Sequence, residues 1–142
     1  MAAQQLPIPA ALEGRSILIV EDDCVTAMDL AETLSAAGAQ IVGPAGSIES
    51  AFELLRDRPQ LDIALLDIEV EGVFVFDVAD ELVKRAVPIV FTTGYERSEI
   101  PVRFGAARHC EKPIGIAAIA RALSDELART SGSRGISPSS AY

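Results

Sequence analysis

The sequence predicts an α/β fold: a doubly wound, five-stranded parallel sheet with helices on both faces. Short apolar runs without charge alternate along the chain with longer segments whose apolar residues recur at helical spacing. The central run, from Ile63 to Leu66, is wholly apolar, as is typical of a strand buried on both faces. Because crossovers between parallel strands are right-handed, strict alternation of strands and helices favours a parallel sheet covered on both sides.

The composition limits the class of protein. A chain of 142 residues is one domain in length, and its net charge of −9 argues against a surface that binds nucleic acid. No apolar run approaches the roughly 18 residues of a membrane span, and the N-terminus lacks the pattern of a signal peptide. We therefore expect a cytoplasmic protein without membrane insertion. Cys24, Cys110 and the single His109 form no metal or CxxC pattern, so both cysteines are interpreted as reduced thiols with packing roles.

The elements follow from local pattern. Strands are expected at residues 17–20, 40–42, 63–66, 88–92 and 107–110. The first helix, 25–37, ends before Gly38, a typical C-cap residue, and the second begins after Ser47, whose hydroxyl can cap it. The third helix follows a loop at Gly72, with Val75, Val78, Ala79, Leu82 and Val83 predicted on one apolar face.

The last part of the chain is less regular. The segment 96–104 contains Pro101 and too few apolar residues to define a helix face, so we expect a reduced fourth helix there. The final helix is predicted over Ile116–Arg129. We expect an N-terminal leader at 1–14, one domain at 15–129, and a flexible tail at 130–142 that is rich in Ser and Gly.

Polar side chains follow several of the predicted strands. Glu21 and Asp22 come directly after the first strand, and Asp67 ends the third. The common strand order 2-1-3-4-5 makes these two strands neighbours and places a crevice at their carboxyl ends. Carboxylates so close repel one another unless a cation joins them, and Mg²⁺ prefers oxygen ligands. Thr93 and Lys112 follow the fourth and fifth strands, so the edge carries the groups that phosphoryl transfer to a side chain requires.

Four motifs in order, ILIVEDD, LLDIEVEG, PIVFTTGY and EKP, make the stretch from about Ser16 to Leu127 resemble the receiver domain of two-component response regulators. The FTTGY stretch resembles a subgroup of single-domain receivers with a Phe-Ala-Thr-Gly-Tyr-like motif, in which the fourth helix is reduced. The resemblance implies a flavodoxin-like fold.

The resemblance also implies roles for single residues. Asp67 matches the phosphoacceptor, Thr93 the switch hydroxyl, and Lys112 the lysine that contacts the phosphoryl group. The metal ligands implied are Glu21, Asp22, Asp67 and the backbone carbonyl of Glu69, with Asp22 binding Mg²⁺ directly. The phosphoryl group would come from a sensor histidine kinase or a phosphotransfer protein. The domain would catalyse only its own phosphorylation and dephosphorylation, so we do not expect a classical enzyme.

The output of such a domain is less defined by the sequence. His109 stands where many receivers have an aromatic residue that moves on activation, so the usual switch through the fourth helix is in doubt. We predict a stand-alone receiver that signals by protein–protein interaction or phosphorelay to an unidentified downstream protein, and homodimerisation is left open. Two alternatives remain: a pseudo-receiver that never takes phosphate, and, less favoured, a haloacid-dehalogenase-like phosphatase, because Asp67-Ile68-Glu69 loosely resembles an Asp-x-Asp motif.

Overall fold

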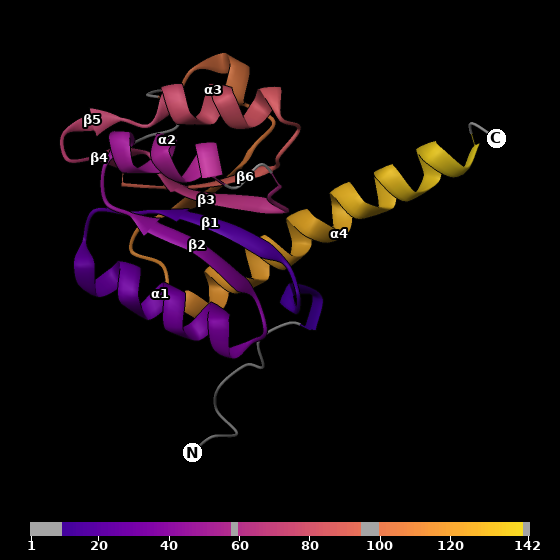
Figure 1. Cartoon of the computed structure of the whole chain (residues 1–142), viewed down its shortest axis with the longest axis horizontal. Coiled ribbons are helices and arrows are strands. Elements are labelled where there is room, and N and C mark those ends of the chain that lie inside the picture. Colours follow the sequence, from indigo (N-terminus) through magenta and orange to yellow (C-terminus); the bar gives the residue numbers. More distant parts are fainter. Residues whose placement is uncertain (1–9, 58–59, 95–99, 141–142) are drawn as a thin grey trace.

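The computed structural model describes residues 10–57, 60–94 and 100–140 (Figure 1). The predicted sheet is confirmed: five parallel strands lie in the order β2-β1-β3-β6-β7, which is the order 2-1-3-4-5 along the chain. The strands are β1 (Ser16–Val20), β2 (Gln40–Ala45), β3 (Ile63–Asp67), β6 (Ile89–Thr93) and β7 (Arg108–Glu111). The first and third strands are therefore neighbours, as expected.

Helices cover both faces of the sheet. They are α1 (Cys24–Ala36), α2 (Ile48–Asp57), α3 (Phe76–Lys84) and α4 (Ile116–Ser140), with short 3-10 helices η2 (Ala10–Leu12) and η4 (Val102–Phe104). In Figure 1, α1 and α4 lie on one face, and α2 and α3 on the other. None of the helices in the described ranges has the length and apolar run needed to cross a membrane.

The core consists of two apolar layers, one on each side of the sheet. Leu66 and Phe91 pack with the α2 and α3 side, whereas Leu65 and Val90 pack with the α1 and α4 side. This division follows from the strand period of two, which points successive side chains to opposite faces. Because both faces are covered, β3 and β6 are buried at every position, and their ends are fixed in place by the layers around them.

Two further sequence predictions concern helix starts and the fourth helix. The predicted cap at Ser47 is confirmed, because its Oγ accepts a hydrogen bond of 3.0 Å from the N–H of Ser50. The expected reduction of the fourth helix is also confirmed as far as the structure describes it: residues 100–107 contain only the 3-10 turn η4. Residues 95–99, which include part of the predicted irregular segment, lie outside the described residues.

Three local predictions differ from the structure. The final helix, predicted over Ile116–Arg129, extends to Ser140; a helix once started is extended at low cost, and the Thr130 hydroxyl donates to the carbonyl of Glu126 at 3.0 Å. Val83 is 57% exposed, because the buried face of α3 consists of Val78, Ala79 and Leu82. The loop predicted at Gly72 is a hairpin made of β4 (Glu69–Val70) and β5 (Val73–Phe74).

Candidate functional site

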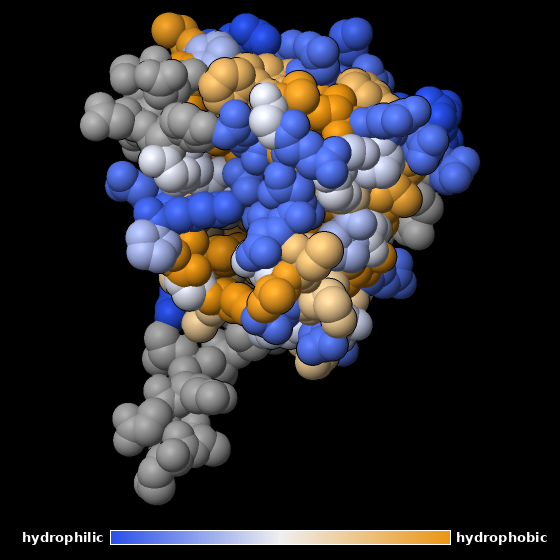
Figure 2. All heavy atoms as spheres, turned by 90° about the vertical axis from the view of Figure 1, so that its left-hand side faces the viewer, coloured by the Kyte–Doolittle hydropathy of each residue, from blue (hydrophilic) through white to orange (hydrophobic). Residues whose placement is uncertain are grey.

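Three predicted carboxylates meet at the carboxyl ends of β1 and β3. The two strands pair in parallel, with Val20 opposite Leu66, so Glu21 and Asp22 come out of the sheet beside Asp67. One oxygen of each carboxylate lies within 4.8 Å of the others. Figure 2 looks onto this end of the sheet and shows hydrophilic side chains gathered in a band with hydrophobic side chains on either side.

Lys112 supplies the cation that contacts this cluster. Its Nζ donates to Oδ2 of Asp67 at 2.8 Å and lies 3.5 Å from Oε1 of Glu21. The sheet positions it, because β7 pairs with β6 and the N–H of Lys112 donates to the carbonyl of Thr93 at 2.8 Å. A single ammonium group does not balance three carboxylates, so the cluster keeps a net negative charge.

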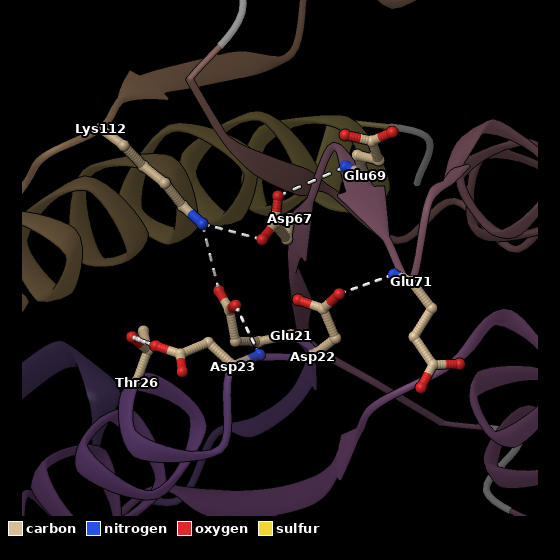
Figure 3. Close-up of polar contacts among 8 residues, drawn as sticks. All are labelled: Glu21, Asp22, Asp23, Thr26, Asp67, Glu69, Glu71 and Lys112. Atoms are coloured by element: carbon tan, nitrogen blue, oxygen red, sulfur yellow. Dashed lines mark hydrogen bonds and ion pairs between the residues drawn. The ribbon is translucent and has the colours of Figure 1, made fainter.

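Main-chain N–H groups hold each of the three carboxylates. The N–H of Asp23 donates to Glu21 Oε2 at 3.1 Å, and the N–H of Glu69 donates to Asp67 Oδ1 at 3.3 Å. The N–H of Glu71 donates to Asp22 Oδ2 at 2.6 Å (Figure 3). The orientation of the acidic side chains is therefore set by the backbone of two loops, one after β1 and one after β3.

The electrostatics of the cluster follow from burial and crowding. Burial raises the pKa of Glu21, and the neighbouring Asp67 adds to this effect, while the Asp23 N–H and Lys112 oppose it. Partial burial alone would lower the pKa of the Lys112 ammonium, but the hydrogen bond and charge of Asp67, with the charge of Glu21, leave it raised. Lys112 is therefore held in its cationic form, whereas burial and the nearby Asp67 make ionisation of Glu21 less favourable.

The other predicted site residues lie close by but differ in exposure. Thr93 ends β6 and is 2% exposed, beside the strand that carries Asp67. Glu69 begins β4, and it reaches Asp67 through its main chain. Asp23 is the N-cap residue of α1, and its carboxylate accepts a hydrogen bond of 2.5 Å from the Thr26 hydroxyl.

One contact of the site was not predicted from the sequence. The N–H of Glu71 reaches Asp22 from the tip of the β4–β5 hairpin. The signal was Glu71-Gly72 between Val70 and Val73, a two-residue turn of the kind that closes a hairpin.

The side of the sheet around β6 and β7 is aromatic. The His109 ring stacks on Phe91 with centroids 5.5 Å apart, and Phe91 meets Phe104 edge to face at 5.6 Å. His109 thus occupies an aromatic environment at the position where the resemblance led us to expect an aromatic residue. Both cysteines are free thiols, as predicted. Cys110 is buried, in keeping with a packing role, but Cys24 is exposed, so the packing role predicted for it is wrong.

The donor set of the cluster suits a hard divalent cation. Glu21, Asp22 and Asp67 offer only oxygen atoms, and Mg²⁺ prefers one or two carboxylates with carbonyl and water ligands. A hollow of about 530 Å³ borders the cluster and is lined by Thr26, Ile114 and Lys112, among others. The site is therefore reachable from solvent.

The solved structures that resemble this chain include SdrG from Sphingomonas melonis Fr1, which is 32% identical, with a TM-score of 0.67 over 82% of this chain and 98% of that chain. The response regulator PhyR from Brucella abortus superposes with a TM-score of 0.74 over 88% of this chain and 53% of that chain. At 22% identity, the PhyR likeness concerns the fold alone.

Relatives are also found by sequence. The transcriptional regulatory protein PdtaR of Mycobacterium tuberculosis is 34% identical over 113 residues, which cover 77% of this chain and 55% of the relative. The chain thus spans about half the length of that protein. Residues 17–124 match the response regulator receiver domain family, which is most of the chain. On this match and on the observed strand order, the chain belongs to the response regulator receiver domain family.

Proposed function

We propose that this receiver accepts a phosphoryl group on Asp67 from a phosphohistidine of a sensor histidine kinase or phosphotransfer protein. The observation that carries the proposal is the contact of 2.8 Å between Lys112 Nζ and Asp67 Oδ2, within a cluster of three carboxylates. An ammonium group that already touches the acceptor carboxylate is placed to contact the oxygens of an incoming phosphoryl group. The signal then passes to another protein, either by a change of surface or by phosphorelay.

The transfer moves one phosphoryl group from the donor to the site, and every bond formed is matched by one broken. A carboxylate oxygen of Asp67 forms a bond to phosphorus while the P–N bond of the phosphohistidine breaks, and the electron pair of that bond stays on the imidazole nitrogen. The product is an acyl phosphate on Asp67 and a free histidine on the donor. Lys112 balances negative charge at the acceptor, and Thr93, at the end of the neighbouring strand, is proposed to contact a phosphoryl oxygen as the protein switches.

Mg²⁺ is part of this proposal. Glu21, Asp22 and Asp67, with the backbone carbonyl of Glu69, would hold the ion, with Asp22 as a direct ligand. When bound, the ion neutralises the negative charge of the cluster and of the phosphoryl group. The net negative charge that one lysine leaves on three carboxylates supports this assignment.

The test is phosphorylation by acetyl phosphate in the presence of Mg²⁺, followed by intact mass measurement. We expect the wild type to gain one phosphoryl group and Asp67→Asn to gain none. Asp29→Asn is the matched control, because Asp29 is exposed on α1, outside the cluster, and undergoes the same chemical change.

The alternatives give different results. No phosphoryl gain by the wild type, together with no change in NMR spectrum on adding Mg²⁺ and fluoroberyllate, would favour the pseudo-receiver. Equal gain by Asp67→Asn would place the acceptor elsewhere. Multiple turnover on a phosphomonoester would instead favour a phosphatase.

A further inference from the structure

We infer that the main-chain N–H of Glu71 is a positioning group for the carboxylate of Asp22, so that the β4–β5 hairpin prepares the cation site. This inference rests on the proposed function, because it concerns Asp22 as a Mg²⁺ ligand. It assigns a role to the turn at Glu71 and Gly72, which the sequence led us to expect only as a loop.

The hairpin has an unusual turn. Val70 pairs with Val73, so Glu71 and Gly72 form a two-residue connection, and both have positive φ angles, 52° and 78°. Positive φ at both positions is the pattern of a type I′ turn, which normally takes Asn, Asp or Gly first. Glu71 is one of two described non-glycine residues with positive φ, the other being Ala86. A left-handed backbone at a non-glycine residue is unfavourable, and such positions often serve a function.

The turn brings one N–H to the acidic cluster. Turn residues lie outside the ladder of paired strands, so the N–H of Glu71 is available for a partner from another part of the chain. It donates to Oδ2 of Asp22 at 2.6 Å, joining residues 49 positions apart. Figure 3 shows that the other oxygen of Asp22 lies on the side of Glu21 and Asp67, whereas the Glu71 side chain points away from them.

This contact matters because Asp22 is otherwise the least constrained of the three carboxylates. Glu21 and Asp67 are buried, with 4% and 8% exposure, and both contact Lys112. Asp22 is exposed. An exposed side chain samples several rotamers, and one hydrogen bond to a fixed N–H selects the rotamer that presents a ligand oxygen to the cluster.

The same stretch also fixes the second ligand. The N–H of Glu69 donates to Asp67 Oδ1 at 3.3 Å. Glu69 lies in β4, opposite Phe74, and Glu71 follows two positions later in the turn. The strand β4 and its turn therefore serve Asp67 and Asp22 together.

The role belongs to the backbone and not to the Glu71 side chain, which makes a sharp test possible. In the test protein, the α-hydroxy analogue of alanine replaces residue 71, so that an ester oxygen stands where the N–H was. Glu71→Ala is the matched control, with the same side chain and charge but an intact N–H. Glu71→Gly is a second control, since glycine retains the N–H and adopts positive φ freely.

Mg²⁺ affinity is measured by calorimetric titration, and unfolding is measured without Mg²⁺ to exclude a general loss of structure. We expect the ester to bind Mg²⁺ about tenfold more weakly than Glu71→Ala, as is common when a group that orients a metal ligand is removed. Glu71→Ala and Glu71→Gly should stay within about threefold of each other. Equal or tighter binding by the ester than by Glu71→Ala would overturn the inference.

A second measurement does not depend on the ester protein. In metal-free wild type, the Glu71 amide proton should resonate downfield and exchange slowly, and Asp22→Ala should reverse both properties, whereas Asp29→Ala should change neither. An unchanged Glu71 amide in Asp22→Ala would overturn the contact itself. Failure of the wild type to bind Mg²⁺ would instead overturn the proposed function, so the two failures are distinguishable.

Discussion

The acidic cluster and the β6–η4–β7 side of the sheet are held by different kinds of contact. At the cluster, polar groups from the ends of β1, β3 and β7 bind one another through hydrogen bonds and ion pairs, with Lys112 between Glu21 and Asp67. On the other side, aromatic rings pack together: the ring centroid of Phe104, in η4, lies 5.7 Å from that of Phe76 and 5.6 Å from that of Phe91. The comparison indicates that the chemistry and the packing of this domain can be changed separately.

The largest expected effect is a loss of stability on the aromatic side that leaves the acidic cluster unchanged. Phe104→Ala removes a ring that is 3% exposed, and we expect the free energy of unfolding to fall by about 3–4 kcal/mol, because a cavity replaces well-packed contacts. Urea denaturation measures the change. Mg²⁺ affinity should stay near that of the wild type under conditions where the variant is folded.

The control for this variant is Val102→Ala in the same 3-10 helix. Val102 is 95% exposed, so its truncation should change the free energy of unfolding by less than about 0.5 kcal/mol. A loss of Mg²⁺ binding in folded Phe104→Ala would show that the aromatic side also supports the acidic cluster, and the separation of the two regions would fail.

The second effect is expected at the cluster. Lys112→Met leaves Glu21 and Asp67 without their cation, so we expect metal-free protein to lose about 2 kcal/mol of stability. Saturating Mg²⁺ should recover part of the loss, since a ligand that binds only the folded state stabilises it. Denaturation with and without Mg²⁺ measures both quantities.

Lys84→Met is the control for Lys112→Met, because it removes a lysine charge outside the acidic cluster. Lys84 is exposed in the last turn of α3. The Lys84→Met variant should have nearly the stability of the wild type, and Mg²⁺ should stabilise both proteins equally. If Lys112→Met were no less stable than Lys84→Met in metal-free protein, the cluster would not depend on the lysine contacts.

These two regions also differ in how far the sequence predicted them. Glu21, Asp67 and Lys112 could be placed together because each lies at or just after the carboxyl end of a predicted strand, and parallel strands end at a common edge. The His109 ring stacks on Phe91 because the two residues lie opposite each other in β7 and β6; the sequence predicted both strands, but not the register that pairs them. The contact between Glu71 and Asp22 was missed because the Glu71-Gly72 pair can indicate a hairpin turn, but residue type does not show which side chain the N–H of that turn reaches.

A third, smaller effect has the opposite sign. Glu21→Gln should modestly raise the stability of metal-free protein at neutral pH, because burial raises the pKa of Glu21 and ionisation of the buried carboxyl is therefore unfavourable. The gain should be absent below the ordinary pKa of 4.5, where both states are protonated, and should grow as pH rises through the raised folded value. Denaturation across this pH range measures it.

The control is Glu32→Gln, because Glu32 is exposed on α1. It should show no such increase with pH. Glu21→Gln should also respond less to Mg²⁺ than the wild type, since it loses one anionic oxygen of the cluster. Lower stability of metal-free Glu21→Gln at neutral pH would mean that the contacts of Glu21 with Lys112 and the Asp23 N–H outweigh the cost of its burial.

The smallest effect is expected at the rim of the aromatic side. Arg103 forms two hydrogen bonds with Asp80, at 2.9 and 3.1 Å, and lies 4.6 Å from the centroid of the Phe104 ring. Both side chains are substantially exposed, so solvent and salt screen the pair. Arg103→Ala should therefore lower stability far less than Phe104→Ala, and high salt should reduce the difference from wild type.

The pH dependence of the same variant separates the ion pair from the ring contact. The Arg103 hydrogen bond lowers the pKa of Asp80 below 3.8, so the contribution of the pair is present above that pH and is lost as pH falls through the lowered value. Any difference that persists below this range belongs to the contact with Phe104. An effect of Arg103→Ala as large as that of Phe104→Ala would show that charge, rather than ring packing, holds η4 against α3.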